Sequence, residues 1–164
     1  MKTTLIITSF LLALSAPVAF AAGAGDHDHG SMHGAAYSFG EPGKAAEVTR
    51  TIKVGMGDDM KFVFDPPIGS IKRGETIRFE VSNAGKQVHE FSVGDAASQR
   101  AHAAMMKKMP DMKHDADPSA VTLEPGKSGS VIWKFSKAPQ GDIVFACQKP
   151  GHYEAGMVHK AKLK

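Results

Sequence analysis

Alternating apolar and polar residues predict a series of short β-strands between residues 47 and 164. In the clearest example Ile77, Phe79 and Val81 alternate with polar residues, as expected of a strand with one face on a core. The other segments rich in β-forming residues are 48–54, 61–64, 88–93, 120–123, 130–135, 143–146 and 157–161, with a short piece at 68–71. Turn residues separate these segments. Seven or eight short strands of this kind predict an all-β fold, a β-sandwich.

Residues 95–118 interrupt the β pattern with an insertion rich in methionine and histidine. Residues 96–108 contain helix-forming residues and no proline, and Pro110 disfavours continuation of the helix. The insertion carries His102, Met105, Met106, Met109, Met112 and His114. The first four lie on one face of a helix, and two interpretations of that face stay open. Either the face packs against the sandwich, or its thioethers form a second site for a soft ion such as Cu(I).

The first residues are typical of a secretory signal peptide, which we assign to residues 1–21. Lys2 precedes a mostly apolar core at residues 5–14, and Ala19 and Ala21 form a small-x-small cleavage site. No later stretch approaches the roughly 20 apolar residues that a membrane-spanning helix needs. We therefore expect an exported protein without membrane insertion, most simply one of a bacterial periplasm.

Residues 22–46 have little to bury and are expected to be a flexible tail. Several potential metal ligands gather between residues 26 and 33, namely His27, His29, Met32 and His33. Short His-rich tracts of this kind are typical of metal binding. The alternative is a tail that only solvates the protein. The predicted globular domain then spans residues 47–164.

The charge of the chain gives no indication of a nucleic-acid partner. The formal charge of +3 is small, and the basic residues are scattered among acidic ones. A nucleic-acid-binding protein would show a concentrated basic patch or a basic and aromatic pattern. Small groups of lysines at residues 107–113 and 160–164 are typical of a solvated surface, although either group could help an acidic partner to dock.

Residue types with specific chemistry gather in the loop from Phe145 to Met157. Cys147 is the single cysteine of the chain, and His152 and Met157 follow it within the loop. Exported proteins usually pair their cysteines in disulfides, so a lone one indicates another role. A thiolate, an imidazole and a thioether are the ligand types of copper electron-transfer sites, which also need a second histidine. His89 is the best candidate for that second histidine.

This loop resembles the C-terminal copper loop of the cupredoxins, the blue-copper protein family. The resemblance covers residues 47–164 and implies a Greek-key β-sandwich that holds one type 1 copper ion. The four ligands that it implies are His89, Cys147, His152 and Met157. Many members of that family carry asparagine or aspartate after the first histidine, where this chain has Glu90. Structural zinc sites normally use more cysteines, and methionine is a poor zinc ligand, so we expect copper.

Copper tolerance is the function that the sequence favours. The His-rich tail and the Met-rich insertion resemble extensions of cupredoxin-like copper-tolerance proteins of bacteria. The alternative is a periplasmic electron-transfer protein that exchanges electrons with redox partners. An enzyme with several copper centres would need paired His-x-His motifs, and only His27-Asp28-His29 has that form, so we expect no enzymatic activity. The expected partners are copper ions and a periplasmic redox or copper-handling protein.

Overall fold

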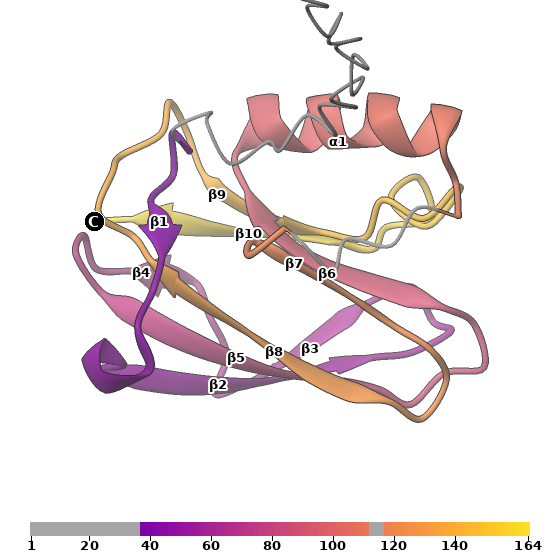
Figure 1. Ribbon diagram of the computed structural model, residues 1–164, viewed down its shortest axis with the longest axis horizontal. Coiled ribbons are helices and arrows are strands. Elements are labelled where there is room, and N and C mark those ends of the chain that lie inside the picture. The colour runs from indigo at the N-terminus through magenta and orange to yellow at the C-terminus, as the bar shows by residue number, and fades with distance from the viewer. Residues whose placement is uncertain (1–36, 112–116) are drawn as a thin grey trace, which may run out of the picture. The chain divides into compact units, whose positions relative to one another are not determined.

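Two five-stranded β-sheets face each other in the computed structural model, which describes residues 37–111 and 117–164 (Figure 1). The first sheet has the order β1 (Glu41–Pro42), β8 (Ser128–Lys134), β5 (Thr76–Asn83), β2 (Arg50–Met56) and β3 (Phe62–Asp65). The second has the order β4 (Ser70–Ile71), β10 (Val158–Leu163), β9 (Ile143–Ala146), β6 (His89–Gly94) and β7 (Ala120–Leu123). The described helices are η2 (Ala45–Glu47) and α1 (Ala96–Lys108), and neither has the length and apolar character needed to cross a membrane.

The predicted β-sandwich is confirmed. Every segment expected to be extended contains a strand, and β1, which has only two residues, was not expected. The alternation in β5 gives the expected burial, because Ile77, Phe79 and Val81 are at most 1% exposed. β2 pairs in parallel with β5, and β4 with β10, so the two sheets are mixed.

Three phenylalanines join the two sheets at the centre of the core. Phe79 of the first sheet lies with its ring centroid 5.2 Å from that of Phe91 and 5.3 Å from that of Phe145 in the second sheet. Phe91 and Phe145 stack at 5.6 Å. Because Phe91 lies two residues after His89 and Phe145 two residues before Cys147, the same packing fixes both strands that carry candidate ligands.

The predicted helix at residues 96–108 is confirmed as α1. Asp95 is its N-cap: the carboxylate accepts hydrogen bonds from the main-chain N–H groups of Ala97 and Ser98, at 3.0 and 2.8 Å. Burial opposes the charged form of Asp95, but hydrogen bonds from Ser38, Ser98 and Ala97 hold its pKa below the usual value. The cap satisfies main-chain donors that the first turn of a helix leaves without partners.

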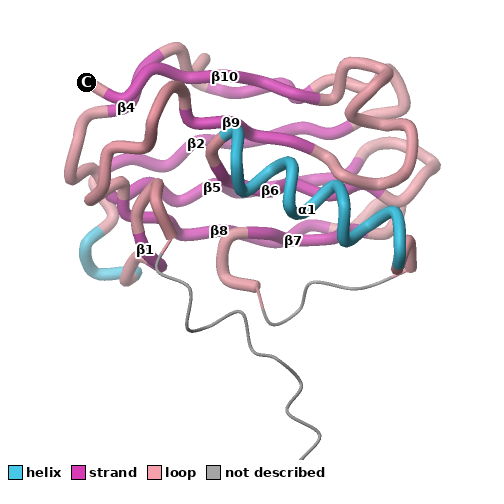
Figure 2. Tube along the Cα trace, turned by 90° about the horizontal axis from the view of Figure 1, so that it is seen from above, coloured by secondary structure: helices cyan, strands magenta, loops and turns pink. Residues whose placement is uncertain are grey.

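Helix α1 covers the outer face of the second sheet, over β6 and β9 (Figures 1 and 2). All six residues of β6 are therefore buried. Side chains alternate along a strand, so Phe91 and Val93 join the hydrophobic core while Glu90 and Ser92 point towards the helix. Two polar side chains are thus buried between a helix and a sheet, where each needs a hydrogen-bond partner.

Residues 37–46 correct the expected boundary of the flexible tail. Phe39 is 1% exposed and stacks on Trp133 at 5.0 Å, and the Tyr37 ring meets Trp133 edge-on at 4.9 Å. The indole N–H of Trp133 donates to the main-chain oxygen of Phe39, and β1 pairs with β8. The prediction of flexibility is wrong here because two aromatic residues within a Gly- and Ala-rich stretch find an aromatic partner. The predicted signal peptide and residues 22–36 lie outside the described part of the chain.

Replacing Phe39 should destabilise the whole domain, although this residue lies outside the domain expected from the sequence. Phe39→Ala removes a fully buried ring and should lower the free energy of unfolding by about 3–5 kcal/mol. Urea denaturation of the metal-free protein measures the change. Val63→Ala is the control, since Val63 is 63% exposed and its loss should cost no more than about 0.5 kcal/mol. Equal effects of the two substitutions would contradict the anchoring role of Phe39.

Candidate metal centre

The loop between β9 and β10 is closed at its base by strand pairing. Cys147 directly follows β9 and Met157 directly precedes β10, and the Cys147 N–H donates to the Met157 oxygen at 3.1 Å. The Met157 N–H in turn donates to the oxygen of His152 at 2.9 Å. Gly151 and Gly156 have φ angles of 84° and 105°, a conformation that favours glycine. These hydrogen bonds therefore hold His152 close to Cys147 and Met157, the two ends of the loop.

The structure brings together three of the four predicted ligands by their ligating atoms. His89, Cys147 and His152 each offer one atom, and these atoms lie within 4.8 Å of one another. The sulfur of Cys147 is 3.3 Å from Nδ1 of His152, and the ring centroids of His89 and His152 are 4.9 Å apart. The fourth predicted ligand, Met157, is fully buried, and its main chain is hydrogen-bonded to the main chains of Cys147 and His152. Its thioether as a fourth ligand stays a prediction.

Asp58, in the turn after β2, orients the His89 ring. One oxygen of its carboxylate lies 3.3 Å from Nε2 of His89. The same carboxylate accepts hydrogen bonds from the main-chain N–H groups of Lys86 and Gln87, and the Lys86 bond is the main reason that the pKa of Asp58 lies below its usual value. A side chain at Gly85 would approach the Asp58 carboxylate to 2.3 Å, so glycine permits this contact.

The contact with Asp58 leaves the other ring nitrogen of His89 available to a metal. Nδ1 of His89 is buried and has no hydrogen-bond partner among the described residues. A buried polar atom without a partner is costly, and a metal ion would satisfy it. Metal-binding histidines commonly donate their second N–H to a carboxylate, which fixes the tautomer.

The thiol of Cys147 is fully buried at the edge of the hydrophobic core. Burial is the largest effect on it and raises its pKa to about 11, although N–H groups of Glu90 and Lys149 point to the sulfur and act in the opposite direction. The Glu90 N–H lies 3.3 Å from the sulfur. The metal-free thiol is therefore protonated at neutral pH, and a bound cation is needed to stabilise the thiolate.

His152 is the ligand candidate nearest to solvent, at 8% exposed. Burial lowers its pKa, and the positive charge of Lys149 acts in the same direction. The ring is thus neutral at neutral pH, which is the form that binds metals. Two imidazoles and a thiol that converge with an unpaired nitrogen fit a copper or zinc ion.

The predicted accessory ligands on α1 and directly after it differ in exposure and in the residues that they contact. Met106 is 1% exposed and Met109 is 43% exposed. His102 contacts the carboxylate of Glu90, and both His102 and Met105 line a cavity of about 350 Å³ beside the helix. Packing of the helix therefore accounts for Met106, whereas a second copper site on this helix stays a prediction. His27, His29, Met32, His33, Met112 and His114 lie outside the described residues.

Sequence reasoning missed two residues that act around the candidate ligands, Asp58 and Gln99. Asp58 stands in an ordinary turn, and nothing in its neighbourhood marks it as a partner of His89. Gln99 lies in the predicted helix with no motif around it, yet it is 5% exposed and its side chain accepts a hydrogen bond from Gln148. The one available indication was Glu90, a charged residue in an apolar strand, which needs a buried partner.

No protein-family model matches the chain. Three curated relatives named copper-resistant cuproprotein CopI are similar to it. The one from Rubrivivax gelatinosus is 48% identical and the match covers 84% of each chain. The one from Pseudomonas aeruginosa is 39% identical, covering 77% of this chain and 81% of the relative. The one from Vibrio cholerae is 35% identical over 99% of both chains.

Two solved structures show the fold. Reduced auracyanin from Roseiflexus castenholzii has a TM-score of 0.56 at 23% identity, covering 71% of this chain and 98% of that chain. Auracyanin B has a TM-score of 0.57 at 22% identity, covering 76% and 96%. The expected cupredoxin-type sandwich is thereby confirmed.

Metal binding should displace the thiol proton, and the affinity should rise with pH. Since the pKa of Cys147 is raised to about 11 and that of His152 is lowered, the proton lost between pH 7 and 9 is that of the thiol. The apparent affinity for Co²⁺, a redox-stable probe, should increase about tenfold for each pH unit in this range. Titrations followed by thiolate-to-cobalt absorption measure it. An affinity that does not change with pH would show that the thiol is already ionised.

Proposed function

This chain belongs to the family of copper-resistant cuproproteins named CopI, and we propose that it binds copper where His89, Cys147 and His152 meet and so contributes to copper tolerance. The observation that carries this proposal is the convergence of three ligating atoms within 4.8 Å. The buried Nδ1 of His89, which has no partner within residues 37–111 and 117–164, supports it. The family relationship supports copper as the ion.

The finer proposal is a single type 1 copper centre. His89 and His152 would bind through Nδ1 and Cys147 through its thiolate, and the thioether of Met157 would be a weak fourth ligand. Copper held in this way supplies one-electron redox chemistry. The chain's own residues keep the two imidazoles and the sulfur in place, and Asp58 and the loop hydrogen bonds limit their movement.

We place the protein in the periplasm and assign it no enzymatic activity. Residues 1–21 would direct export. Residues 26–33 would then bind additional copper with their histidines, as the composition of that tract suggests. In this proposal the histidines of the tail would supply additional ligands for copper, and His89, Cys147 and His152 would hold the ion of the buried centre.

Electron transfer is the second candidate function. The observation that favours it is the unequal exposure of the ligand candidates: His89 and Cys147 are 0% exposed, whereas the mostly buried His152 retains 8% exposure. A rigid site with one ligand edge near solvent suits the transfer of electrons to a docked partner. The two functions are compatible, since copper tolerance can include a redox step.

Copper titration of the mature protein should give one intensely coloured centre, which Cys147→Ser abolishes. The colour arises from charge transfer between the thiolate and Cu(II), and serine supplies no thiolate. Visible absorption with copper analysis measures colour and stoichiometry together. His159→Gln is the matched control, because His159 lies outside the ligand cluster, with Nε2 at 2.7 Å from the oxygen of Ile68, and its loss should spare the colour.

Deleting residues 26–33 in the same titration should reduce the number of bound copper ions without changing the coloured centre. Wild-type protein that binds copper but shows no strong thiolate absorption would refute the type 1 centre.

Deleting the gene should separate the two candidate functions. For copper tolerance, growth in excess copper should fall, while respiration at low copper stays normal. Growth curves across a copper series and oxygen uptake measure the two effects. Complementation with the wild-type gene should restore growth, and complementation with the Cys147→Ser variant should not. Impaired respiration with unchanged copper sensitivity would favour the electron carrier instead.

A further inference from the structure

We propose that helix α1 is a structural part of the metal centre, with His102 and Gln99 as positioning residues. They hold Glu90 and Gln148, which directly follow the ligand candidates His89 and Cys147 in the chain. The proposal rests on the copper site proposed above and extends it to residues that contact no ligand themselves.

Glu90 is the first link between the helix and the site. Its side chain is 0% exposed, and its carboxylate oxygens lie 3.0 and 3.3 Å from Nε2 of His102. One oxygen also accepts the N–H of Gln148 at 3.4 Å. The Glu90 main chain donates to the sulfur of Cys147 at 3.3 Å. A buried carboxylate needs partners of this kind, so the position of His102 constrains the residue that contacts the sulfur.

Gln148 is the second link. It is 6% exposed, and its side-chain nitrogen donates to the side-chain oxygen of Gln99 at 2.9 Å. The amide nitrogen of Gln99 donates to the hydroxyl of Ser92 at 3.0 Å and to the oxygen of Val144 at 3.2 Å. One helix side chain thus connects β6, β9 and the residue after Cys147.

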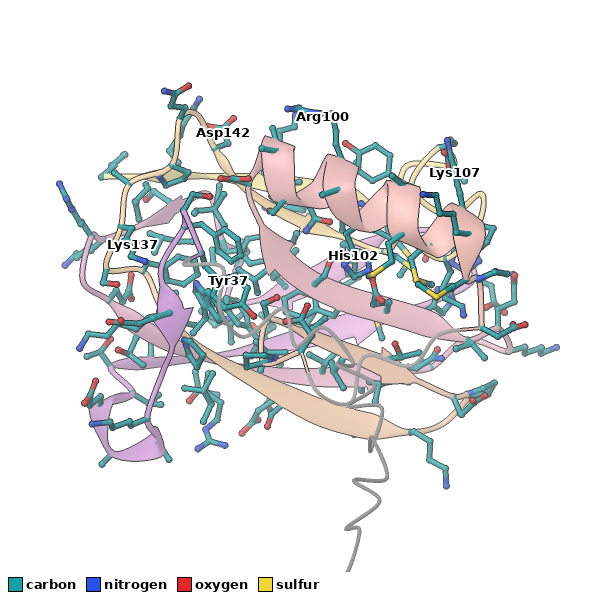
Figure 3. The ribbon with its side chains drawn as sticks, turned by 45° about the horizontal axis from the view of Figure 1, so that its top comes forward. Tyr37, Arg100, His102, Lys107, Lys137 and Asp142 are labelled. Carbon is teal, nitrogen blue, oxygen red and sulfur yellow. The ribbon has the colours of Figure 1, made fainter. Side chains whose placement is uncertain are left out.

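The two positioning residues belong to one face of the helix. Residues three apart lie on the same side of an α-helix, and Gln99 and His102 have this spacing. Figure 3 shows His102 on the side of α1 that faces the sheet, whereas Arg100 and Lys107 lie on the other side and are exposed. His102 and Gln99 on the sheet-facing side of α1 therefore contact the polar side chains that β6 and the loop direct towards the helix.

The contacts of His102 and Gln99 would affect a bound copper ion through the sulfur of Cys147. The potential and electronic structure of a copper–thiolate site depend on hydrogen bonds around the cysteine sulfur, and residues that orient the ligands are commonly worth 10–100-fold in metal affinity or activity. Loss of the His102 side chain removes the contact of Nε2 with both oxygens of the buried Glu90 carboxylate. Glu90 and Gln148, the residue after Cys147, are then less firmly held next to the sulfur.

The test compares three full-length mature variants: His102→Ala, His102→Gln and Asp95→Ala. Glutamine keeps an N–H donor near the position of the histidine Nε2. Asp95→Ala is the matched control, because it weakens α1 at the N-cap and keeps the contacts of Gln99 and His102. The copper-loaded proteins are compared by the ratio of their thiolate-to-copper absorption bands and by reduction potential. The metal-free proteins are compared by the rate at which iodoacetamide modifies Cys147.

His102→Ala should change the band ratio, shift the potential and weaken copper binding about tenfold or more, and its metal-free thiol should react faster. His102→Gln should restore most of these properties. Asp95→Ala should leave them near the wild-type values while lowering the melting temperature. A His102→Ala protein with unchanged spectrum, potential and thiol reactivity would overturn the proposal, as would equal shifts in Asp95→Ala.

Failure of the copper site itself would be recognised separately. If wild-type protein forms no coloured centre, the proposed function fails, and the thiol reactivity of the metal-free variants still decides the positioning role. Faster modification of Cys147 in His102→Ala than in Asp95→Ala supports that role, and equal rates refute it.

Discussion

The hydrogen bond from the Glu90 main chain to the sulfur of Cys147 joins the two strands on which the site depends. β6 carries His89 and β9 ends at Cys147, and the two strands pair antiparallel through residues further along β6. The stack of Phe91 on Phe145 fixes their inner faces. A shift of either strand would separate the ligating atoms, so the packing of the core and the geometry of the site are one constraint.

Burial on both faces of β6 explains why the insertion is polar where it meets the sheet. Without α1, Glu90 and Ser92 would face solvent, as outward residues of a sandwich strand usually do. With α1 in place they need internal partners, and His102 and Gln99 supply them. Gly94 contributes by its size, since a side chain there would approach the Ser98 hydroxyl to 2.5 Å. The helix and the strand are therefore matched residue by residue.

Local patterns predicted the fold and the ligand loop well, because their information lies within a few residues. The alternation of β5, the helix at 96–108 and the order of Cys147, His152 and Met157 are of this kind. The remaining features depend on partners far apart in the chain. The bond between Trp133 and Phe39 spans 94 positions, and the contact between His89 and Asp58 spans 31. No local pattern specifies which of several turns supplies the carboxylate.

The burial of the ligand candidates also bears on what the site does within copper tolerance. A site that stores and releases ions needs access for exchange, yet His89, Cys147 and Met157 are fully buried and His152 is only 8% exposed. Electrons pass through such an edge more readily than ions do, because ion release would require the hydrogen-bonded loop to open. For the copper site proposed above, this arrangement suits an ion that is retained rather than one that exchanges quickly with solvent.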